Sequence, residues 1–400
     1  MRKRILIYAA ISAILAAGCD DAPYGIIENA VYISEAAPED RFTQQVENQT
    51  VDGTVEKTIT VRLAKAVDSD VTVTLGIDEE MLDTYNSRKG TSYMVLPEEY
   101  RSFDSEVTIP AGSISAVSTL TIRQFQTPNG EAYAIPLTIS SVTGPVTTAG
   151  DARHILYLLM APHFQKTPLL NPSNAGGCKA SFTTPVTGLS EWTVEFWMKM
   201  TNTAGYTSAN GVFYGNSSPV AFSDLYLRWW PNGAMQKGPC FQNQMTGVYF
   251  DDNTEAWKAD TWYHVAYTYD GSLIQMYIDG QKNANKQMES GKTFSFGTVT
   301  LVGGSWCYGQ ACSLAQIRMW DKCLSQATLQ DAMNRGVPSD SPGLFGYWKC
   351  DEGEGSLLKD SSPGGNDIQL KSAPKWSDEI NFLHPNGKDA GWCLISYGFS

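Results

Sequence analysis

Two short segments of the sequence combine aromatic rings with polar side chains, a combination that can bind sugars. They span residues 226–233 and 305–310. A flat ring holds the C–H face of a sugar, while amides, carboxylates and guanidinium groups hydrogen-bond its hydroxyls. Successive strand residues point to opposite faces, so at most one of Trp229 and Trp230 faces a core. The alternative is that these rings pack under loops. The candidate ligand contacts are Arg228, Trp229, Trp230, Trp306 and Tyr308.

A second group of candidate ligands lies in a glycine-rich acidic stretch, residues 351–366. Calcium takes several oxygen ligands from carboxylates, amides and backbone carbonyls on such loops. Asp351, Asp360 and Asn366 are therefore candidate calcium ligands. The alternative is that the two aspartates organise turns by accepting hydrogen bonds from backbone N–H groups.

The sequence lacks the common patterns of catalytic nucleophiles and of histidine metal ligands. The four histidines are scattered, and none forms a ligand pair at metal spacing. No motif for a serine or cysteine nucleophile occurs. Glu191 and Glu195 are four residues apart, which places both on one face of a strand. The net charge of −13 argues against nucleic acid as a partner.

The N-terminus has the layout of a secretory signal. A basic start is followed by apolar residues 5–15, a run too short to cross a bilayer, which takes about 20 residues. Small residues 16–18 then precede Cys19. This arrangement resembles the bacterial lipobox, which implies acylation of Cys19 and cleavage just before it. The alternative is an ordinary signal peptide that ends near a cysteine. The acidic residues 20–21 that follow the cysteine direct lipoproteins to the outer surface in some bacteria, whereas in others an Asp at this position keeps them at the inner membrane. Because of the domains described below, we expect a lipid-anchored protein of the outer membrane that faces the cell exterior.

Eight cysteines are present, so seven remain besides Cys19. An exported compartment permits disulfides, and the odd number leaves at least one thiol unpaired within a monomer. Cys307 and Cys312 flank a short glycine-containing loop and could close it. A closed loop would hold Trp306 rigidly, which lowers the entropy cost of binding.

Residues 29–160 have the pattern of short antiparallel strands. Ile59, Val61 and Leu63 alternate with polar residues, and this period of two recurs in later segments. The spacing favours an immunoglobulin-like sandwich. The ordered motifs are GTSY at 90–93, LPEEY at 96–100, VTIPAG at 107–112 and YAIPL at 133–137. Together they resemble a domain of unknown function in surface lipoproteins of glycan-harvesting Gram-negative bacteria. The resemblance implies a sandwich found beside glycan-binding modules and endo-acting glycosidases, without chemistry of its own.

From residue 169 to 376 the strand patterns become rich in aromatic residues. The motifs are WTVEFW at 192–197, WYHVA at 262–266, YIDG at 277–280, VGG at 302–304, QIRMW at 316–320, GYWKCDEGEG at 346–355 and a serine- and glycine-containing turn at 360–366. They resemble the laminin-G-like branch of the concanavalin A-like lectin and glucanase superfamily. The resemblance implies a jelly-roll sandwich of two antiparallel sheets, often with one bound calcium.

Several positions of this region have a predicted structural role. Ser325 can cap a helix over residues 326–334, with Gly336 just past its end. The tryptophans in strand patterns are expected in the core. These are Trp192, Trp197, Trp262, Trp320 and Trp348.

The glucanases of this superfamily carry a Glu-x-Asp-x-x-Glu strand, which positions carboxylates for glycoside hydrolysis. That spacing occurs nowhere in the sequence. The resemblance assigns no catalytic role to the positions of Glu191 and Glu195. We therefore expect a protein that binds glycans without cutting them.

The sequence as a whole predicts an all-β protein with two sandwich domains. The predicted segments are a signal peptide (1–18), a lipidated linker (19–28), an immunoglobulin-like domain (29–160), a linker (161–168), a laminin-G-like domain (169–376) and a tail (377–400). The expected function is capture of oligo- or polysaccharide at the cell surface for uptake, beside an outer-membrane importer. The alternatives are an endo-acting glycoside hydrolase and a protein-binding adhesive module.

Overall fold

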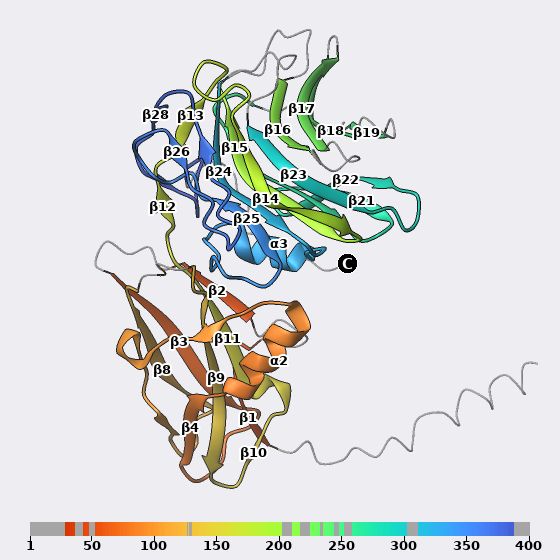
Figure 1. The fold of residues 1–400 in the computed structure, drawn as a ribbon. Helices are drawn as coiled ribbons and strands as arrows, with labels where there is room; N and C mark the ends of the chain where they lie inside the picture. The colour runs from red at the N-terminus through yellow and green to blue at the C-terminus, as the bar shows by residue number, and fades with distance from the viewer. Residues whose placement is uncertain are drawn as a thin grey trace, which may run out of the picture.

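The computed structural model describes residues 29–36, 43–47, 53–125, 127, 130–201, 210–216, 225–232, 235–243, 248–251, 258–301 and 311–387. These residues form two β-rich domains that lie end to end (Figure 1). Within the described residues, no helix has the length and apolar character needed to cross a membrane.

The N-terminal domain is a sandwich of two sheets. One sheet has the order β10-β1-β3-β8-β6, and the other has the order β2-β11-β9-β4-β7 with β5 added to β9. The first sheet consists of β1 (Ala30–Ile33), β3 (Thr54–Leu63), β6 (Arg101–Ser102), β8 (Ser115–Arg123) and β10 (Thr147–Thr148). The second consists of β2 (Thr43–Glu47), β4 (Val71–Ile77), β5 (Met94–Val95), β7 (Glu106–Ile109), β9 (Tyr133–Thr143) and β11 (His154–Met160). Two 3-10 turns, η1 (Glu98–Tyr100) and η2 (Asp151–Arg153), complete the domain.

The core of this domain follows the predicted alternation. Ile59, Val61 and Leu63 of β3 are buried, and they pack in one cluster with Val71 and Val73 of β4. The polar residues between them point outward, because side chains alternate across a strand. The prediction of an immunoglobulin-like sandwich in an all-β chain is confirmed.

One helix of the N-terminal domain was not expected. α2 (Glu79–Lys89) begins after Asp78, whose side chain accepts a hydrogen bond of 3.0 Å from the backbone N–H of Met81. It ends at Gly90, which has a left-handed conformation with φ 68°. Such an N-cap and a C-terminal glycine are helix signals that the sequence contained. Leu82 of this helix is buried against the second sheet.

The C-terminal domain is a larger sandwich. Its first sheet has the order β22-β21-β20-β15-β24-β13-β28 with β25 added to β24, and its second has the order β14-β23-β16-β17-β18-β19. The first sheet consists of β13 (Pro168–Leu170), β15 (Trp192–Met200), β20 (Trp262–Tyr269), β21 (Leu273–Ile278), β22 (Gln281–Gln287), β24 (Cys312–Trp320), β25 (Leu344–Trp348) and β28 (Lys375–Trp376). The second consists of β14 (Lys179–Leu189), β16 (Asn210–Asn216), β17 (Leu225–Asn232), β18 (Met235–Asn243), β19 (Val248–Asp251) and β23 (Phe294–Leu301).

Two short strand pairs accompany these sheets. They are β12 (Phe164–Gln165) with β29 (Ile380–Asn381), and β26 (Leu357–Leu358) with β27 (Ile368–Gln369). The first pair joins the segment between the domains to a segment close to the C-terminal end of the described chain.

The larger sheet is buried on both faces. Its inner face, with Val194, Phe196 and Met198 of β15, packs into the main core between the sheets. Its outer face is covered by α3 (Gln326–Ala332) and by Phe382, whose ring lies 5.5 Å from Trp197. The predicted helix is present with Ser325 as its N-cap, but it ends at Ala332 rather than at residue 334, and its C-cap is Met333. All five tryptophans expected in the core are buried, with exposed fractions of 5% or less.

Candidate functional site

The predicted aromatic site lies mostly outside the described residues. Trp306, Tyr308 and Cys307 belong to the segment 302–310, and Cys19, the predicted lipidation residue, also lies outside. The structure places the backbone of Arg228, Trp229 and Trp230 in β17, within the second sheet and between β16 and β18. Their side chains lie outside the described part of the structure, so their contact with a ligand stays a prediction.

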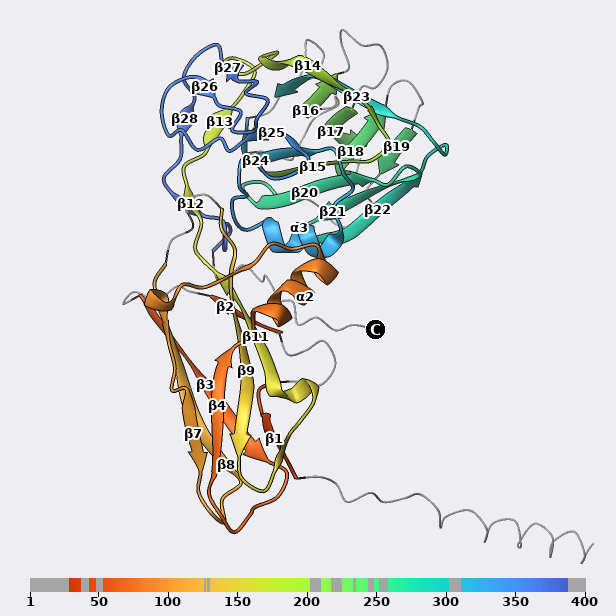
Figure 2. The same ribbon diagram turned by 60° about the horizontal axis from the view of Figure 1, so that its bottom comes forward.

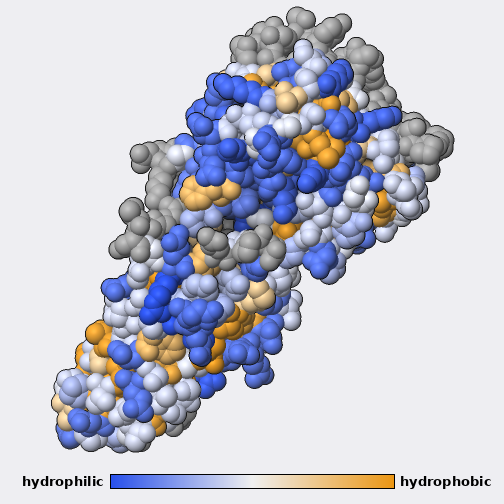
Figure 3. Space-filling view, turned by 60° about the vertical axis from the view of Figure 1, so that its left-hand side comes forward, coloured by the Kyte–Doolittle hydropathy of each residue, from blue (hydrophilic) through white to orange (hydrophobic). Residues whose placement is uncertain are grey.

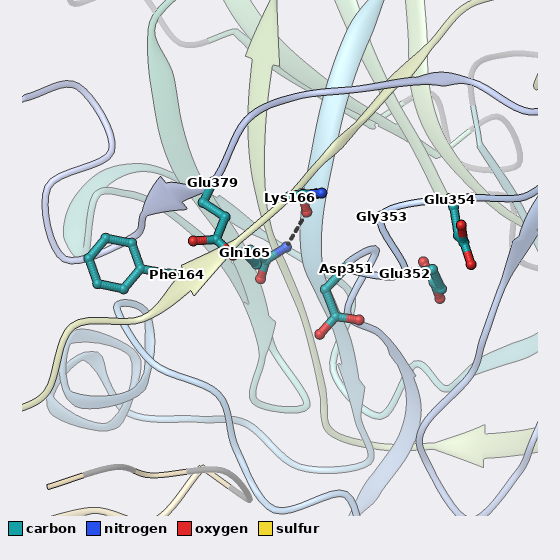
Figure 4. A pocket seen from close by; sticks show the side chains of 8 residues that line it. All are labelled: Phe164, Gln165, Lys166, Asp351, Glu352, Gly353, Glu354 and Glu379. Carbon is teal, nitrogen blue, oxygen red and sulfur yellow. Dashed lines mark hydrogen bonds between the residues drawn. The ribbon is translucent and has the colours of Figure 1, made fainter.

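A pocket of about 360 Å³ opens beside the segment that joins the two domains. Its walls come from β12, from the loop after β25 and from the segment before β29. The lining residues are Phe164, Gln165, Lys166, Asp351, Glu352, Gly353, Glu354 and Glu379. In the view of Figure 4, Phe164 and Glu379 lie at one side, Glu352 and Glu354 at the other, and Asp351 between them. This side of the C-terminal domain is mostly hydrophilic, with separate apolar patches (Figure 3).

The side chains of the pocket combine one exposed ring with an excess of negative charge. Phe164 has an exposed fraction of 58%, one of the highest among the described large apolar side chains. Four carboxylates line the pocket, and the amine of Lys166 is the single positive charge among the lining residues. A ring next to several hydrogen-bond acceptors can hold an uncharged polyhydroxyl ligand by its C–H face and its hydroxyls.

Glu352 has the most unusual environment in the pocket. Its Oε1 accepts a hydrogen bond of 2.8 Å from the backbone N–H of Lys359. Its Oε2 is buried and has no hydrogen-bond partner. Burial raises the pKa of Glu352, and the neighbouring Asp351 raises it further. The raised pKa makes the protonated carboxyl group of Glu352 more stable than that of an ordinary glutamate.

Gln165 is the rigid part of the pocket wall. Its side chain is buried, and its Oε1 accepts a hydrogen bond of 2.6 Å from Gln316 Nε2. Its Nε2 donates to the carbonyl oxygen of Lys349 at 3.1 Å. Gln316 reaches this position from a β-bulge in β24, where its φ is 52°. A bulge adds a residue to one strand and redirects a side chain. The wall is thereby fixed to the larger sheet.

The three candidate calcium ligands separate into two places. Asp351 lines the pocket, whereas Asp360 and Asn366 form a buried loop structure elsewhere. Asp360 Oδ1 accepts hydrogen bonds from the backbone N–H groups of Tyr347 (2.8 Å) and Ser362 (3.0 Å). Its Oδ2 accepts one from the backbone N–H of Asn366 at 2.8 Å.

Asp360 therefore does what the alternative interpretation expected, because its carboxylate organises turns through backbone hydrogen bonds. Asn366 continues the same structure, since its Oδ1 accepts a hydrogen bond of 3.0 Å from the backbone N–H of Thr183. Among the described residues, no group of three or more His, Cys, Asp or Glu side chains is arranged to hold a metal ion. Calcium binding stays a prediction.

Glu195 is placed where no substrate can reach it. It is completely buried on the outer face of the larger sheet, beneath α3. Its Oε2 lies 3.2 Å from His264 Nε2, and its Oε1 lies 3.5 Å from Arg318. Burial alone would raise the pKa of Glu195, but Arg318 and His264 outweigh burial and lower it. Glu195 therefore forms a buried ion pair with Arg318 and contacts His264.

The four cysteines whose side chains the structure describes are free: Cys178, Cys312, Cys323 and Cys350. Cys312 is buried at the start of β24, and burial raises the pKa of its thiol to about 12. A thiol of this kind stays protonated and unreactive at neutral pH. Because Cys312 is a free, buried thiol in this structure, the predicted pair of Cys307 and Cys312 is not formed.

Comparison with known proteins finds a family match in each domain and a named superfamily for the C-terminal one. Residues 173–330 match the family model of the concanavalin A-like lectin/glucanases superfamily, and residues 27–146 match the model of an N-terminal domain family. The C-terminal sandwich is thus a concanavalin A-like lectin/glucanase domain. None of the curated proteins matches the chain.

Three solved structures illustrate the similarity. A proposed carbohydrate binding protein from Bacteroides ovatus is 18% identical over 87% of this chain and 97% of its own, with a TM-score of 0.53. EndoBT-3987 of Bacteroides thetaiotaomicron, solved with a Man5GlcNAc product, is 25% identical over 33% of this chain and 30% of its own, with a TM-score of 0.28. A SAP-like pentraxin from Limulus polyphemus is 13% identical over 54% of this chain and 94% of its own, with a TM-score of 0.37. The first similarity extends over both domains and shows the shared fold.

Sequence reasoning missed most of the pocket. Phe164 was assigned to a linker and Glu379 to a tail, while Glu352 and Glu354 were only neighbours of the candidate calcium ligands. No local pattern marks the first two residues as partners, because β12 and β29 meet only through a long-range strand pair.

Proposed function

We propose that this chain is a non-catalytic, lipid-anchored protein of the cell surface that binds glycans. It would capture oligo- or polysaccharide for uptake, beside an importer in the outer membrane. The lectin-type sandwich supports glycan binding, and so does the similarity to a proposed carbohydrate binding protein over both domains. The lipobox at Cys19 supports the anchor.

The observation that carries this proposal is the exposed ring of Phe164 at the edge of an acidic pocket. A single exposed ring is common on a protein surface, but a ring that stands beside several hydrogen-bond acceptors can serve as a platform for the C–H face of a sugar. Sugars fit this surface because each presents both an apolar C–H face and hydroxyl donors. Gln165, held by hydrogen bonds to Gln316 and Lys349, gives the ring a fixed support.

Calorimetry on the mature protein against a panel of host and plant glycans tests the proposal. At least one glycan should bind, and Phe164→Ala should weaken that binding about tenfold, which corresponds to about 1.4 kcal/mol. Val117→Ala is the control, because it also truncates an exposed apolar side chain. Val117 is 65% exposed, belongs to the N-terminal domain and does not line the pocket. Absence of binding to every glycan, together with capture of a protein partner, would favour an adhesive module.

A second function is favoured by the two adjacent carboxyl groups of Asp351 and Glu352 that line the pocket, of which Glu352 has a raised pKa because it is buried. Glycoside hydrolases use one carboxyl group as an acid and a second as a base or nucleophile. If the pocket hydrolyses glycans, mass spectrometry detects product release from the same panel. Glu352→Gln would then abolish release while binding persists. Unchanged glycans after long incubation would support the binding-only proposal.

A further inference from the structure

The two domains touch at a second place besides the segment that links them. The end of α2 and the residues after it approach α3 and the turn that follows it, as both ribbon views show (Figures 1 and 2). Gly90, at the end of α2, lies next to Thr328 of α3: a Cβ added to Gly90 would lie 3.5 Å from the Thr328 Oγ1.

Four residues connect the domains at this place, and we name them the interdomain clamp: Tyr93, Gly130, Asp331 and Arg335. The hydroxyl of Tyr93 donates a hydrogen bond to Asp331 Oδ1. The other carboxylate oxygen of Asp331 accepts from Arg335 at 2.6 Å. A second nitrogen of Arg335 donates to the carbonyl oxygen of Gly130 at 3.1 Å.

The groups of the clamp are well shielded from water. The side chains of Arg335 and Asp331 have exposed fractions of 18% and 10%. Burial, together with the Asp331 carboxylate, raises the pKa of Tyr93 well above its ordinary value, so the hydroxyl remains a donor. Shielded, charge-assisted hydrogen bonds are stronger than exposed ones.

The backbones also meet directly within the clamp. Gly130 has φ 77°, and a Cβ at this position would lie 2.7 Å from backbone atoms of Gly336 and Val337. The absence of a side chain at Gly130 therefore allows the two domains to approach closely.

The covalent link between the domains is fixed as well. β12 pairs with β29, and the carbonyl oxygen of His163 accepts a hydrogen bond of 2.8 Å from the backbone N–H of Phe382. The two attachments are connected inside the C-terminal domain. Arg318 donates to the carbonyl oxygen of Arg335 at 2.5 Å and to Gln316 Oε1 at 3.0 Å, and Gln316 holds Gln165.

We propose that the interdomain clamp holds the two domains in one orientation, so that the chain behaves as a single rigid unit. One covalent link would allow rotation, whereas two separated attachments prevent it. The pocket would then face a constant direction relative to the N-terminal end of the chain, and this conclusion does not depend on what the pocket binds.

Small-angle X-ray scattering and differential scanning calorimetry on the full mature chain test this proposal. The double variant Tyr93→Phe/Asp331→Asn removes clamp contacts, and Tyr100→Phe/Asp340→Asn makes the same chemical changes at residues that form none of the clamp hydrogen bonds. The wild type and the control should have the same maximum dimension, and each should unfold in a single transition. The clamp variant should show a larger maximum dimension and two transitions.

Two outcomes would overturn the proposal. One is a wild-type protein whose scattering requires several domain orientations, and the other is a clamp variant that scatters and unfolds like the wild type. If the double variant does not fold, Tyr93→Phe alone decides, because it removes only one hydroxyl. Its scattering should still show a larger maximum dimension than that of Tyr100→Phe.

Discussion

Gln165 and Gln316 are joined by a hydrogen bond of 2.6 Å, although 151 positions separate them in the sequence. Gln316 also accepts hydrogen bonds from Tyr347 at 2.5 Å and from Arg318 at 3.0 Å. This one buried amide therefore joins the pocket wall, the bulge in β24 and the charged cluster beneath α3. Loss of the Gln316 amide should lower the free energy of unfolding and weaken ligand binding at the pocket.

Gln316→Leu should lower the free energy of unfolding by about 3 kcal/mol, because several buried groups lose their partner at once. Urea denaturation followed by tryptophan fluorescence measures this change. Gln281→Leu, at an exposed position of β22, is the control and should shift the free energy by less than about 0.5 kcal/mol. Equal effects of the two variants would mean that the Gln165–Gln316 contact contributes little.

Glu195→Gln should destabilise the protein by about 3 kcal/mol at neutral pH, because the buried charge of Arg318 loses its partner. The pKa of Glu195 is lowered in the folded protein, so its stabilising effect is complete above the unfolded pKa of about 4.3. The effect is lost as the pH falls through the lower, folded pKa. The difference in unfolding free energy between wild type and variant should therefore shrink in acid. A pH-independent difference would contradict the ion-pair interpretation.

Burial lowers the pKa of His163, and Arg318 lowers it further. In the unfolded chain, the pKa of this histidine returns to about 6.5, so the unfolded chain binds a proton at a higher pH than the folded protein does. The histidine therefore costs no folding stability above pH 6.5, and it destabilises the folded protein below that pH. In thermal unfolding experiments, the melting temperature of the wild type should fall as the pH falls from 6.5 toward the pKa of His163 in the folded protein. His163→Gln should reduce this slope, whereas His384→Gln should keep it. If His384→Gln removes the slope instead, His163 is not its source.

The calcium prediction and the hydrogen-bond role of Asp360 give different results in melting experiments. If calcium binds, the melting temperature in calcium exceeds that in EDTA, and Asp351→Asn removes the difference. If Asp360 acts only through its backbone hydrogen bonds, Asp360→Ala lowers the melting temperature equally in both buffers. The expected loss is about 3 kcal/mol, since three backbone N–H groups lose their acceptor.

The sandwich cores followed from the sequence because period-2 alternation and strand tryptophans report burial directly. Ile59, Val61 and Trp192 are buried as that pattern requires. α3 was found through its capping serine, but α2 was overlooked although Asp78 and Gly90 mark its ends. Its low apolar content explains this, since Leu82 is its one buried residue and no amphipathic period stands out.

The pocket could not be predicted, because its residues meet through long-range pairing. Phe164 comes next to Glu379 because β12 pairs with β29, more than 200 positions later in the chain. Nothing in either short segment specifies this pairing. The bulge at Gln316 is equally invisible, since a positive φ at a glutamine has no sequence signature.

The strand pair of β12 and β29 also decides how the lectin-type domain can be produced on its own. A fragment that starts at residue 169 lacks β12 and leaves Ile380 and Asn381 without their backbone partners. The fragment also lacks Gln165, so the buried amide of Gln316 loses a hydrogen-bond partner. A recombinant fragment intended for crystallisation or ligand screening should therefore begin before His163 and extend past Phe382.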